Sequence, residues 1–226
     1  MFKYETHLHT AETSKCARSG GAEMARHFAS LGYAGIFVTD HFFNGNTTVP
    51  HELPWEERVR RFLAGWEEAK AAGEPLGLDV FFAWEYSYGW AHFLTYGLPP
   101  AWLYAHPDVL DWPVAQYLEN VRRDGGYIVH AHPMRKTGNP VMPVIPSLTD
   151  AVEIVNGGRS DEENERGATY ARAFSLPVTA GSDIHVTAAA RHAGVLSEER
   201  FTDGAAYARA VIEGRVTLFC DAPAHA

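Results

Sequence analysis

Short apolar segments alternate with longer amphipathic stretches along this chain. Residues 2–6 and 33–39 have the compact, strand-like character of buried β-strands. Between them, residues 21–31 place apolar side chains at helical spacing, so that one face of a helix is apolar. The start of the chain therefore predicts a β-α-β unit.

The same alternation continues to the end of the sequence. Amphipathic stretches predict helices over 54–72, 113–124, 161–175 and 203–214. Apolar runs predict strands over 80–84, 127–131, 151–155 and 177–180, with a further candidate at 93–98. This order favours a mainly parallel sheet covered by helices, either open or closed into a barrel. The length of 226 residues and the lack of a repeat or linker predict a single domain.

Side chains that bind metals follow the predicted strands. His7 and His9 stand at the first strand, and Asp183 and His185 follow the strand at 177–180. Residues two apart in an extended strand face the same side, so each pair can reach one ion. Further candidates lie between these pairs: Asp40, His41, Glu85, His92, His130 and His132.

The placement of these candidates favours a barrel over an open sheet. In a barrel the carboxyl ends of the strands meet at one rim, where residues distant in sequence share a site. An open sheet would spread them along one edge unless they gathered at a switch point. Imidazole suits zinc, iron or manganese, and carboxylates can bridge two ions. Two ions about 3.5–4 Å apart can acidify a shared water for phosphoryl transfer. The set indicates a hydrolytic metal centre.

Charge and cysteine content limit the possible partners and the cellular compartment of the protein. The formal net charge of -9 and a pI near 5.7 argue against a general nucleic-acid-binding surface. Cys16 and Cys220 lack the spacing of a disulfide framework, which indicates a reducing compartment. There is no signal-like N-terminus and no run of about 20 apolar residues that would span a membrane. We expect a soluble, cytoplasmic protein without a membrane partner.

Seven motifs in order resemble the polymerase and histidinol phosphatase (PHP) family. They are ETHLHT (5–10), FVTDH (37–41), AWEYS (83–87), AHFLTYG (91–97), HAHP (130–133), VEIVNG (152–157) and TAGSDIH (179–185). The resemblance spans nearly the whole chain and implies a single PHP domain over 1–226. It implies a distorted seven-stranded (β/α) barrel, similar to a TIM barrel, with a metal centre at the carboxyl rim and phosphoester hydrolysis as the usual activity.

The resemblance also implies which residues bind metal. One ion would be bound by His7, His9, Glu85 and Asp183. Glu85 would bridge to a second ion, which His92 and His132 also bind. A third ion would take His41 and His185 together with Cys16, which stands in a loop where family members often have a histidine. The implied cofactors are two or three divalent transition-metal ions: zinc, manganese or iron.

The implied mechanism is in-line hydrolysis by a hydroxide that bridges the metals. Arg135 is the first candidate for binding phosphate, because a guanidinium matches phosphate geometry. Asp40 is expected to orient a ligand, and His130 to lie beside the ligands or face the substrate. The proton donor stays open among metal-bound water, Asp40 and His192. Further loop arginines near the motifs are Arg18, Arg159 and Arg191.

The acidic balance favours a small phosphomonoester as substrate. Three alternatives stay open: an exonuclease or phosphodiesterase that acts on nucleic-acid ends, an amidohydrolase-type C–N hydrolase, and a non-catalytic metal-binding domain. An amidohydrolase would normally have a bridging lysine where Glu85 stands. The aromatic residues near Glu85 either line a pocket for a ring or pack in the core: Tyr86, Tyr88, Trp90 and Phe93. The oligomeric state also stays open.

Overall fold

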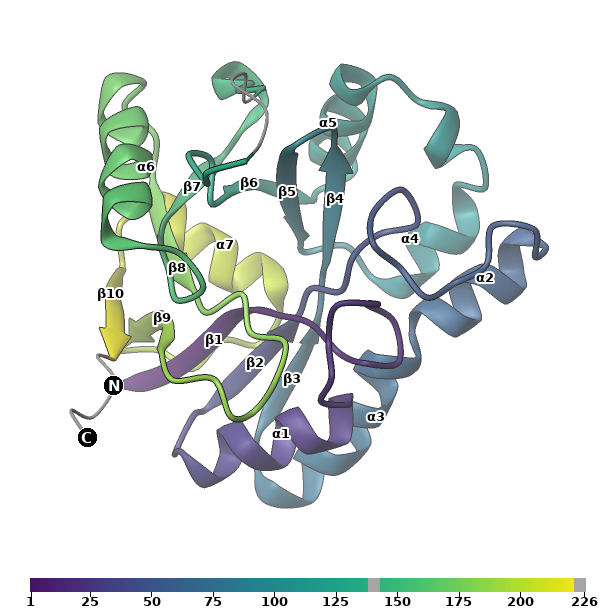
Figure 1. The fold of residues 1–226 in the computed structure, drawn as a ribbon, viewed down its shortest axis with the longest axis horizontal. Coiled ribbons are helices and arrows are strands. Elements are labelled where there is room, and N and C mark those ends of the chain that lie inside the picture. The colour runs from purple at the N-terminus through teal and green to yellow at the C-terminus, as the bar shows by residue number, and fades with distance from the viewer. Residues whose placement is uncertain (138–142, 222–226) are drawn as a thin grey trace.

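The computed structural model describes residues 1–137 and 143–221, whose strands form two five-stranded sheets (Figure 1). The first has the order β10-β9-β1-β2-β3 and contains β1 (Phe2–Leu8), β2 (Gly35–Val38), β3 (Asp79–Phe82), β9 (His192–Ser197) and β10 (Val216–Asp221). The second has the order β4-β5-β6-β7-β8 and contains β4 (Trp84–Tyr88), β5 (Ala91–Tyr96), β6 (Tyr127–Ala131), β7 (Ala151–Asn156) and β8 (Val178–Gly181).

Helices cover the outer faces of these sheets (Figure 1). They are α1 (Gly21–Ser30), α2 (Trp55–Phe62), α3 (Ala64–Gly73), α4 (Pro100–Ala105), α5 (Val114–Arg123), α6 (Asp161–Ala173) and α7 (Gly204–Ile212), with short 3₁₀ turns at Glu74–Leu76, Val109–Asp111 and Pro146–Leu148. None of the helices in the described ranges is long and apolar enough to cross a membrane.

The mixed α/β class is as predicted, but the closed seven-stranded barrel is not found among the described strands. Strands β1 to β3 are parallel, as are β6 to β8. The β4–β5–β6 and β1–β9–β10 pairs are antiparallel. A two-residue turn with Gly89 at a φ of 59° joins β4 to β5, and this conformation favours glycine. Single bridges from Leu8 to Ile184 and from His41 to Glu85 connect the two sheets.

Two of the predicted elements are each divided into two in the structure. The helix predicted over 54–72 is divided at Leu63 into α2 and α3. The apolar run at 80–84 is divided at Ala83, where the chain leaves the first sheet and enters the second. Helix α4 was not predicted, although Pro100 suits a first helical turn. Strand β9 was also missed.

The central core lies between the two sheets. Tyr4 and Phe37 from the first sheet meet Leu94 and Tyr96 from the second, with Tyr207 of α7 against them. All five side chains are buried. A second apolar cluster lies between α1, α3 and the first sheet, and a third lies under α2, α4 and α5. This packing holds the carboxyl ends of β1, β2, β6 and β8 in fixed relative positions, at one end of the core.

Candidate metal centre

The residues predicted to bind metal converge where β1, β2, β6 and β8 end. Within the described residues, four groups of side chains have ligand atoms that all lie within 4.8 Å of one another: His7, His9 and Asp183; His7, Glu85 and His132; His41, Glu85 and His92; and His9, His41 and His185. These groups share members, so they form one continuous cluster. The structure thus brings together all eight predicted histidine and carboxylate ligands.

Glu85 lies in the middle of this cluster. Its Oε1 is 2.7 Å from Nδ1 of His92 and 3.2 Å from Nε2 of His132. Its Oε2 is 2.7 Å from Nδ1 of His41. The side chain of Glu85 is fully buried, and β4 directs it away from the core face on which Tyr86 packs. One carboxylate that faces imidazoles on both of its oxygens is placed as a bridging ligand would be.

Asp183 completes the cluster from the loop after β8. Its Oδ1 lies 3.4 Å from Nε2 of His9 and 3.5 Å from Nε2 of His7. Its φ of 55° is in the left-handed region, which Asp adopts more readily than most residues. Glu5 holds this loop, because its Oε1 accepts hydrogen bonds from the backbone N–H of Ser182 at 2.9 Å and of His7 at 2.8 Å. The two ends of the chain are thereby joined beside the site.

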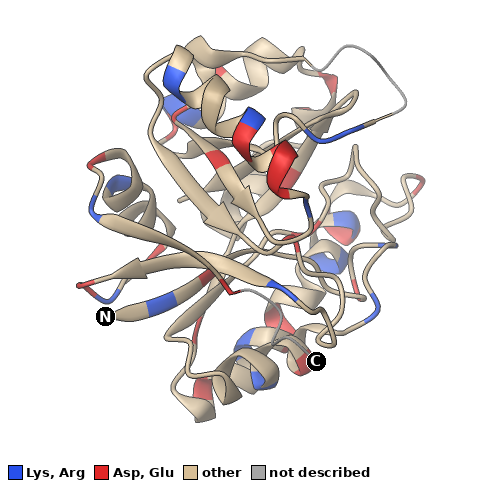
Figure 2. Cartoon of the chain, turned by 60° about the vertical axis from the view of Figure 1, so that its left-hand side comes forward, with Lys and Arg blue, Asp and Glu red and all other residues tan. Residues whose placement is uncertain are grey.

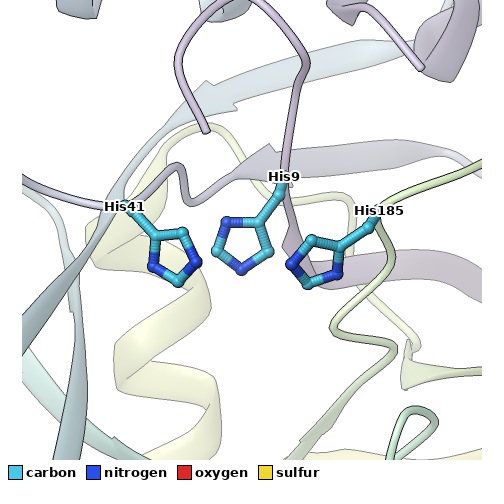
Figure 3. A group of neighbouring side chains, drawn as sticks. All are labelled: His9, His41 and His185. Carbon is cyan, nitrogen blue, oxygen red and sulfur yellow. The ribbon is translucent and has the colours of Figure 1, made fainter. Parts of the chain in front are cut away.

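His9, His41 and His185 form a row of imidazoles (Figure 3). The ring of His9 lies between the other two, with its centroid 4.4 Å from each. They come from the end of β1, the end of β2 and the loop after β8. Sγ of Cys16 lies 3.2 Å from Nε2 of His41. Burial raises the pKa of Cys16, but hydrogen bonds with His185 and His41 lower it to about 6. The thiolate, which is the metal-binding form, is therefore favoured at this position.

Glu153 of β7 is a site residue that the sequence did not reveal. Its Oε1 lies 2.9 Å from Nδ1 of His7, and its Oε2 accepts a hydrogen bond of 3.0 Å from the backbone N–H of His132. It also accepts a hydrogen bond of 2.8 Å from Nδ2 of Asn156. A carboxylate on one imidazole nitrogen fixes the tautomer and leaves Nε2 free for metal. An acidic residue inside the apolar VEIVN run was the available signal.

Asp40 is buried beside two of the predicted ligands, His9 and His41, with Ser14 between them. Its oxygens accept hydrogen bonds of 2.7 Å from the backbone N–H of Thr10, 2.6 Å from the Thr10 hydroxyl and 2.7 Å from the Ser14 hydroxyl. The same Ser14 oxygen accepts a 3.0 Å hydrogen bond from the backbone N–H of His41 and lies 3.3 Å from Nδ1 of His9. Asp40 thus orients two ligands through Ser14. Burial raises its pKa to about 6, although these hydrogen bonds lower it.

The cluster is electrostatically suited to cations. Burial raises the pKa of Glu85, but the imidazoles of His92 and His41 outweigh this effect and hold the pKa well below its usual range. The pKa of Asp183 is also well below its usual range, because His7 and His9 outweigh burial. Burial and the neighbouring His41 lower the pKa of His9 well below its usual value. Despite burial, Glu153 and Asp183 raise the pKa of His7 well above its usual value, and Glu85 raises that of His41 to about 10, so a bound metal would displace protons from these two imidazoles.

The donor atoms also fit a metal ion individually. Nδ1 of His41 and Oε2 of Glu85 are buried and have no hydrogen-bond partner in the described part of the chain, although they lie 2.7 Å apart. Leaving a buried polar atom unpaired costs about 1–3 kcal/mol, a cost that ligation of a common ion would remove. Imidazole nitrogens, carboxylate oxygens and a thiolate are ligands typical of divalent zinc, iron or manganese.

A cavity of about 280 Å³ opens onto the cluster. It is lined by Cys16, His41, Asn46, Glu85, His92, His132, Arg135, Arg159, Asp183 and His185. Nη2 of Arg135 lies 3.0 Å from Nε2 of His92, and Nη2 of Arg159 donates to Oδ2 of Asp183 at 3.1 Å. The Nε atoms of both arginines are buried without a partner in the described residues. Two guanidinium groups therefore border the space above the ligands.

Other candidates from the sequence lie outside this cavity. Arg191 instead donates to Asp161 at 2.6 Å and to the backbone carbonyl of Arg159 at 3.2 Å. His130 is fully buried, and its ring packs against Phe93 and Tyr170 in the layer between β6 and α6. Burial lowers the pKa of His130, and the neighbouring His132 and His92 lower it further, so His130 lies beside the predicted ligands but does not face the cavity.

The remaining candidates near the site divide between the core and the surface. Tyr86 and Phe93 pack in the core, whereas Tyr88 and Trp90 are exposed at the β4–β5 turn. His192 lies against His27, with the two Nε2 atoms 3.1 Å apart.

Comparisons with known proteins agree with this description. Residues 161–189 match the family model described as PHP-associated. A comparison with curated protein sequences finds no match. A candidate metal-dependent phosphoesterase from Bifidobacterium adolescentis is similar in structure, with a TM-score of 0.59 and 18% identity over 93% of this chain and 96% of that one.

Two further solved structures share the fold. A two-domain protein from Bacteroides vulgatus, which contains a predicted PHP-like metal-dependent phosphoesterase, has a TM-score of 0.71 and 15% identity; the match covers 96% of this chain and 64% of that one. An amidohydrolase from Chromobacterium violaceum has a TM-score of 0.53 and 16% identity, over 81% of this chain and 87% of that one. The PHP-associated match and the shared fold confirm the resemblance to the PHP family that the motifs indicate.

Proposed function

We propose that this protein is a metal-dependent hydrolase that cleaves small phosphomonoesters. The central observation is that Glu85 lies buried among imidazoles at the base of a cavity that Arg135 and Arg159 border. A bridging carboxylate with imidazoles and two guanidinium groups provides for both metal binding and phosphate binding. The same fold occurs in a candidate metal-dependent phosphoesterase from B. adolescentis and in a two-domain B. vulgatus protein that contains a predicted PHP-like metal-dependent phosphoesterase, which supports this assignment.

Each group has a role in this proposal. His7, His9 and Asp183 would bind one ion and His92 and His132 a second, with Glu85 between them. When bound, such ions acidify water and offset the charge that develops on a transferring phosphoryl group. Arg135 and Arg159 bind the phosphoryl oxygens and orient the phosphorus above Glu85. When substrate enters, Arg135 and Arg159 would exchange their hydrogen bonds to His92 and Asp183 for hydrogen bonds to the phosphate.

A third ion would be bound by Cys16, His41 and His185. The contact of 3.2 Å between Sγ of Cys16 and Nε2 of His41 supports this part of the proposal. A thiolate favours zinc or iron over manganese at that position. A reduced thiol as ligand also fits a reducing, cytoplasmic compartment.

Water in the cavity is the proposed proton donor to the leaving group. Asp40 is unsuited to this role, because both of its oxygens accept hydrogen bonds from Thr10 and Ser14 and it is buried. His192 is unsuited because it lies against His27 and does not line the cavity. Neither side chain therefore meets the substrate.

The substrate class follows from the size and charge of the site. A cavity of about 280 Å³ suits a small molecule. Figure 2 shows Lys and Arg interspersed with Asp and Glu on the helices, so that no basic stripe forms in that view. A nucleic-acid track would need clustered positive charge to release counterions. The two arginines beside the ligands match the dianionic end of a monoester.

A panel of phosphoesters, assayed with added manganese, zinc or iron, tests this function. We expect hydrolysis of small phosphomonoesters and at least two bound ions per chain by elemental analysis. Faster hydrolysis of oligonucleotides than of any mononucleotide or sugar phosphate would favour the exonuclease alternative. Metal binding without hydrolysis of any ester would favour a non-catalytic domain.

An amidohydrolase is the second candidate function, because the C. violaceum amidohydrolase shares the fold. An amidohydrolase of the kind considered from the sequence would use metal-activated water on C–N bonds. The carboxylate of Glu85, in place of a bridging lysine, argues against it. Hydrolysis of lactams or amides by a protein that leaves p-nitrophenyl phosphate intact would favour this candidate over the phosphoesterase.

A further inference from the structure

A second pair of histidines lies outside the metal centre, where α1 meets the start of β9. His27 is in the last turn of α1, and His192 is the first residue of β9. Both side chains are partly buried. Their Nε2 atoms lie 3.1 Å apart, with ring centroids separated by 5.3 Å. Two segments 165 residues apart in sequence thus present the same imidazole atom to each other.

Phe28 supports both rings. Its buried side chain packs edge-on against His27 at 5.2 Å and against His192 at 5.7 Å between centroids. Because Phe28 belongs to the core cluster under α1, it limits the positions that the imidazoles can take. The Nε2 atoms are therefore directed toward each other by packing as well as by their own contact.

The distance between these nitrogens is close to that of two ligands on one ion. Zinc–nitrogen bonds of about 2.0–2.1 Å place two ligands of a tetrahedral site about 3.3 Å apart. Burial lowers the pKa of His27 and also that of His192, where the neighbouring His27 lowers it further. The neutral imidazoles that result are the form that binds metal.

Charges around the pair also suit a cation. Glu23 lies one helical turn before His27, and Asp221 is paired with His192 in the β9–β10 ladder. The positive charges nearby are Lys3, whose Nζ is bound to Asp221 at 2.8 Å, and Arg26, which precedes His27 in α1 and acts on Glu23. The protein as a whole has a formal net charge of -9, which favours cation binding.

We infer that His27 and His192 form a second site for a divalent transition-metal ion, such as zinc, with Nε2 of each histidine as a ligand. The ion would join α1 to β9, and solvent would complete its coordination. This site is separate from the centre around Glu85, because the ring of His192 packs against His27 and Phe28 and neither histidine lines the cavity above the cluster. It does not depend on the proposed phosphoesterase activity.

Equilibrium dialysis of the whole protein against buffered zinc tests the inference. Bound zinc is counted per chain in the wild type and in the His27→Gln and His192→Gln variants. We expect each variant to bind one ion fewer than the wild type at saturation. His51→Gln is the matched control, because this exposed histidine has a glutamate 3.7 Å away as its ion-pair contact. It should bind as many ions as the wild type.

Two further measurements separate this site from the main centre. Circular dichroism establishes that each variant is folded, and zinc-dependent hydrolysis should be unchanged in both variants. Zinc should also raise the melting temperature of the wild type more than that of either variant, since binding to the folded state stabilises it. Equal zinc counts in the wild type and both folded variants would show a simple N–H···N hydrogen bond and overturn the inference.

Discussion

Oε1 of Glu153 lies 2.9 Å from Nδ1 of His7, while the other carboxylate oxygen binds the backbone N–H of His132. One buried side chain therefore orients a predicted ligand on β1 and another that directly follows β6. His7 is held in the tautomer that directs Nε2 toward Asp183 and Glu85, at 3.5 Å from each. The metal centre depends on β7 even though none of the predicted ligands lies on it.

Replacing Glu153 should weaken metal binding. In Glu153→Gln only the oxygen of the side-chain amide can accept a hydrogen bond. Either the contact that fixes the tautomer of His7 or the hydrogen bond from the backbone N–H of His132 is therefore lost. Loss of such a partner typically lowers metal affinity about 10–100-fold. Titration with a metal-sensitive dye measures the change. Glu165→Gln, at an exposed residue paired with Arg172, is the control and should bind like the wild type. Unchanged affinity in Glu153→Gln would leave Glu153 with a purely structural role.

Glu85→Gln should abolish most hydrolysis while the protein stays folded. The amide lacks the charge that offsets two ions, and metal stabilisation of a phosphoryl transition state is worth several kcal/mol. At about 1.4 kcal/mol for each tenfold change in rate, kcat/KM should fall at least about 100-fold. Steady-state kinetics on p-nitrophenyl phosphate, with circular dichroism for folding, measure this. Full activity in the variant would remove Glu85 from the mechanism.

Cys16 offers a test of the third ion through a pair of variants. Cys16→Ser removes the thiolate, and we expect one ion fewer per chain by elemental analysis. Cys16→His supplies the residue that PHP family members often have in this loop, and it should restore the ion. Cys220→Ser, at a free cysteine that does not line the cavity, is the control and should bind as many ions as the wild type. Equal metal content in the wild type, Cys16→Ser and Cys16→His would show that Cys16 is not a ligand.

Gly65 allows α3 to approach the site closely. A Cβ at this position would meet Oγ1 of Thr10 at 1.8 Å and Oδ2 of Asp40 at 3.0 Å. Gly65→Ala should therefore destabilise the protein by about 1–3 kcal/mol, as overpacking usually does. Urea denaturation measures it. The control is Gly167→Ala in α6, where the nearest atom is 3.6 Å away and alanine should be neutral or stabilising. If both variants had equal stability, the close contact at Gly65 would be unimportant.

The clustering of these side chains could be predicted, because candidate metal ligands leave a local signal in the sequence. His7-x-His9, Asp183-x-His185 and the residues around Glu85 follow apolar runs in the sequence, and their spacing is readable without the fold. Glu153 was not predictable in the same way. Its partner His7 is 146 residues away, and their contact depends on the sheet register. The sequence around Glu153 shows only an acidic residue in a strand.

The division into two sheets was also hidden in the sequence. Ala83 separates β3 from β4 by a single residue inside one apolar run, so that no turn signal marks the change of sheet. Strand β9 begins at His192 and contains Gly194, and this glycine weakens its strand signal. The structure explains this glycine, because a Cβ there would lie 2.1 Å from the backbone oxygen of Tyr4 on the neighbouring strand. The close approach of neighbouring strands therefore selects glycine at this position, which the hydrophobic periodicity of the sequence does not reveal.

His130 should make the protein sensitive to acid. Both of its ring nitrogens are buried without a partner in the described residues, and burial lowers its pKa to about 3. The unfolded chain has an ordinary histidine pKa of about 6.5, so between these values it binds a proton that the folded protein does not. Above about pH 6.5 His130 does not lower the free energy of unfolding. Below this pH, the free energy of unfolding falls by about 1.4 kcal/mol per pH unit until the pH approaches 3.

His130→Phe should remove this contribution. Phenylalanine has a ring of similar size, fits beside Phe93 and Tyr170, and carries no nitrogen that burial leaves unpaired. Urea denaturation of the metal-free protein from about pH 7.5, above the unfolded-state pKa, down to about pH 4.5, where only the unfolded chain binds the proton, should show a shallower loss of stability in the variant. His51→Phe, at an exposed histidine, should leave the slope unchanged. If His130→Phe and the wild type lost stability in parallel, His130 would be protonated or hydrogen-bonded in the folded protein, and the acid sensitivity would originate in the ligand histidines instead.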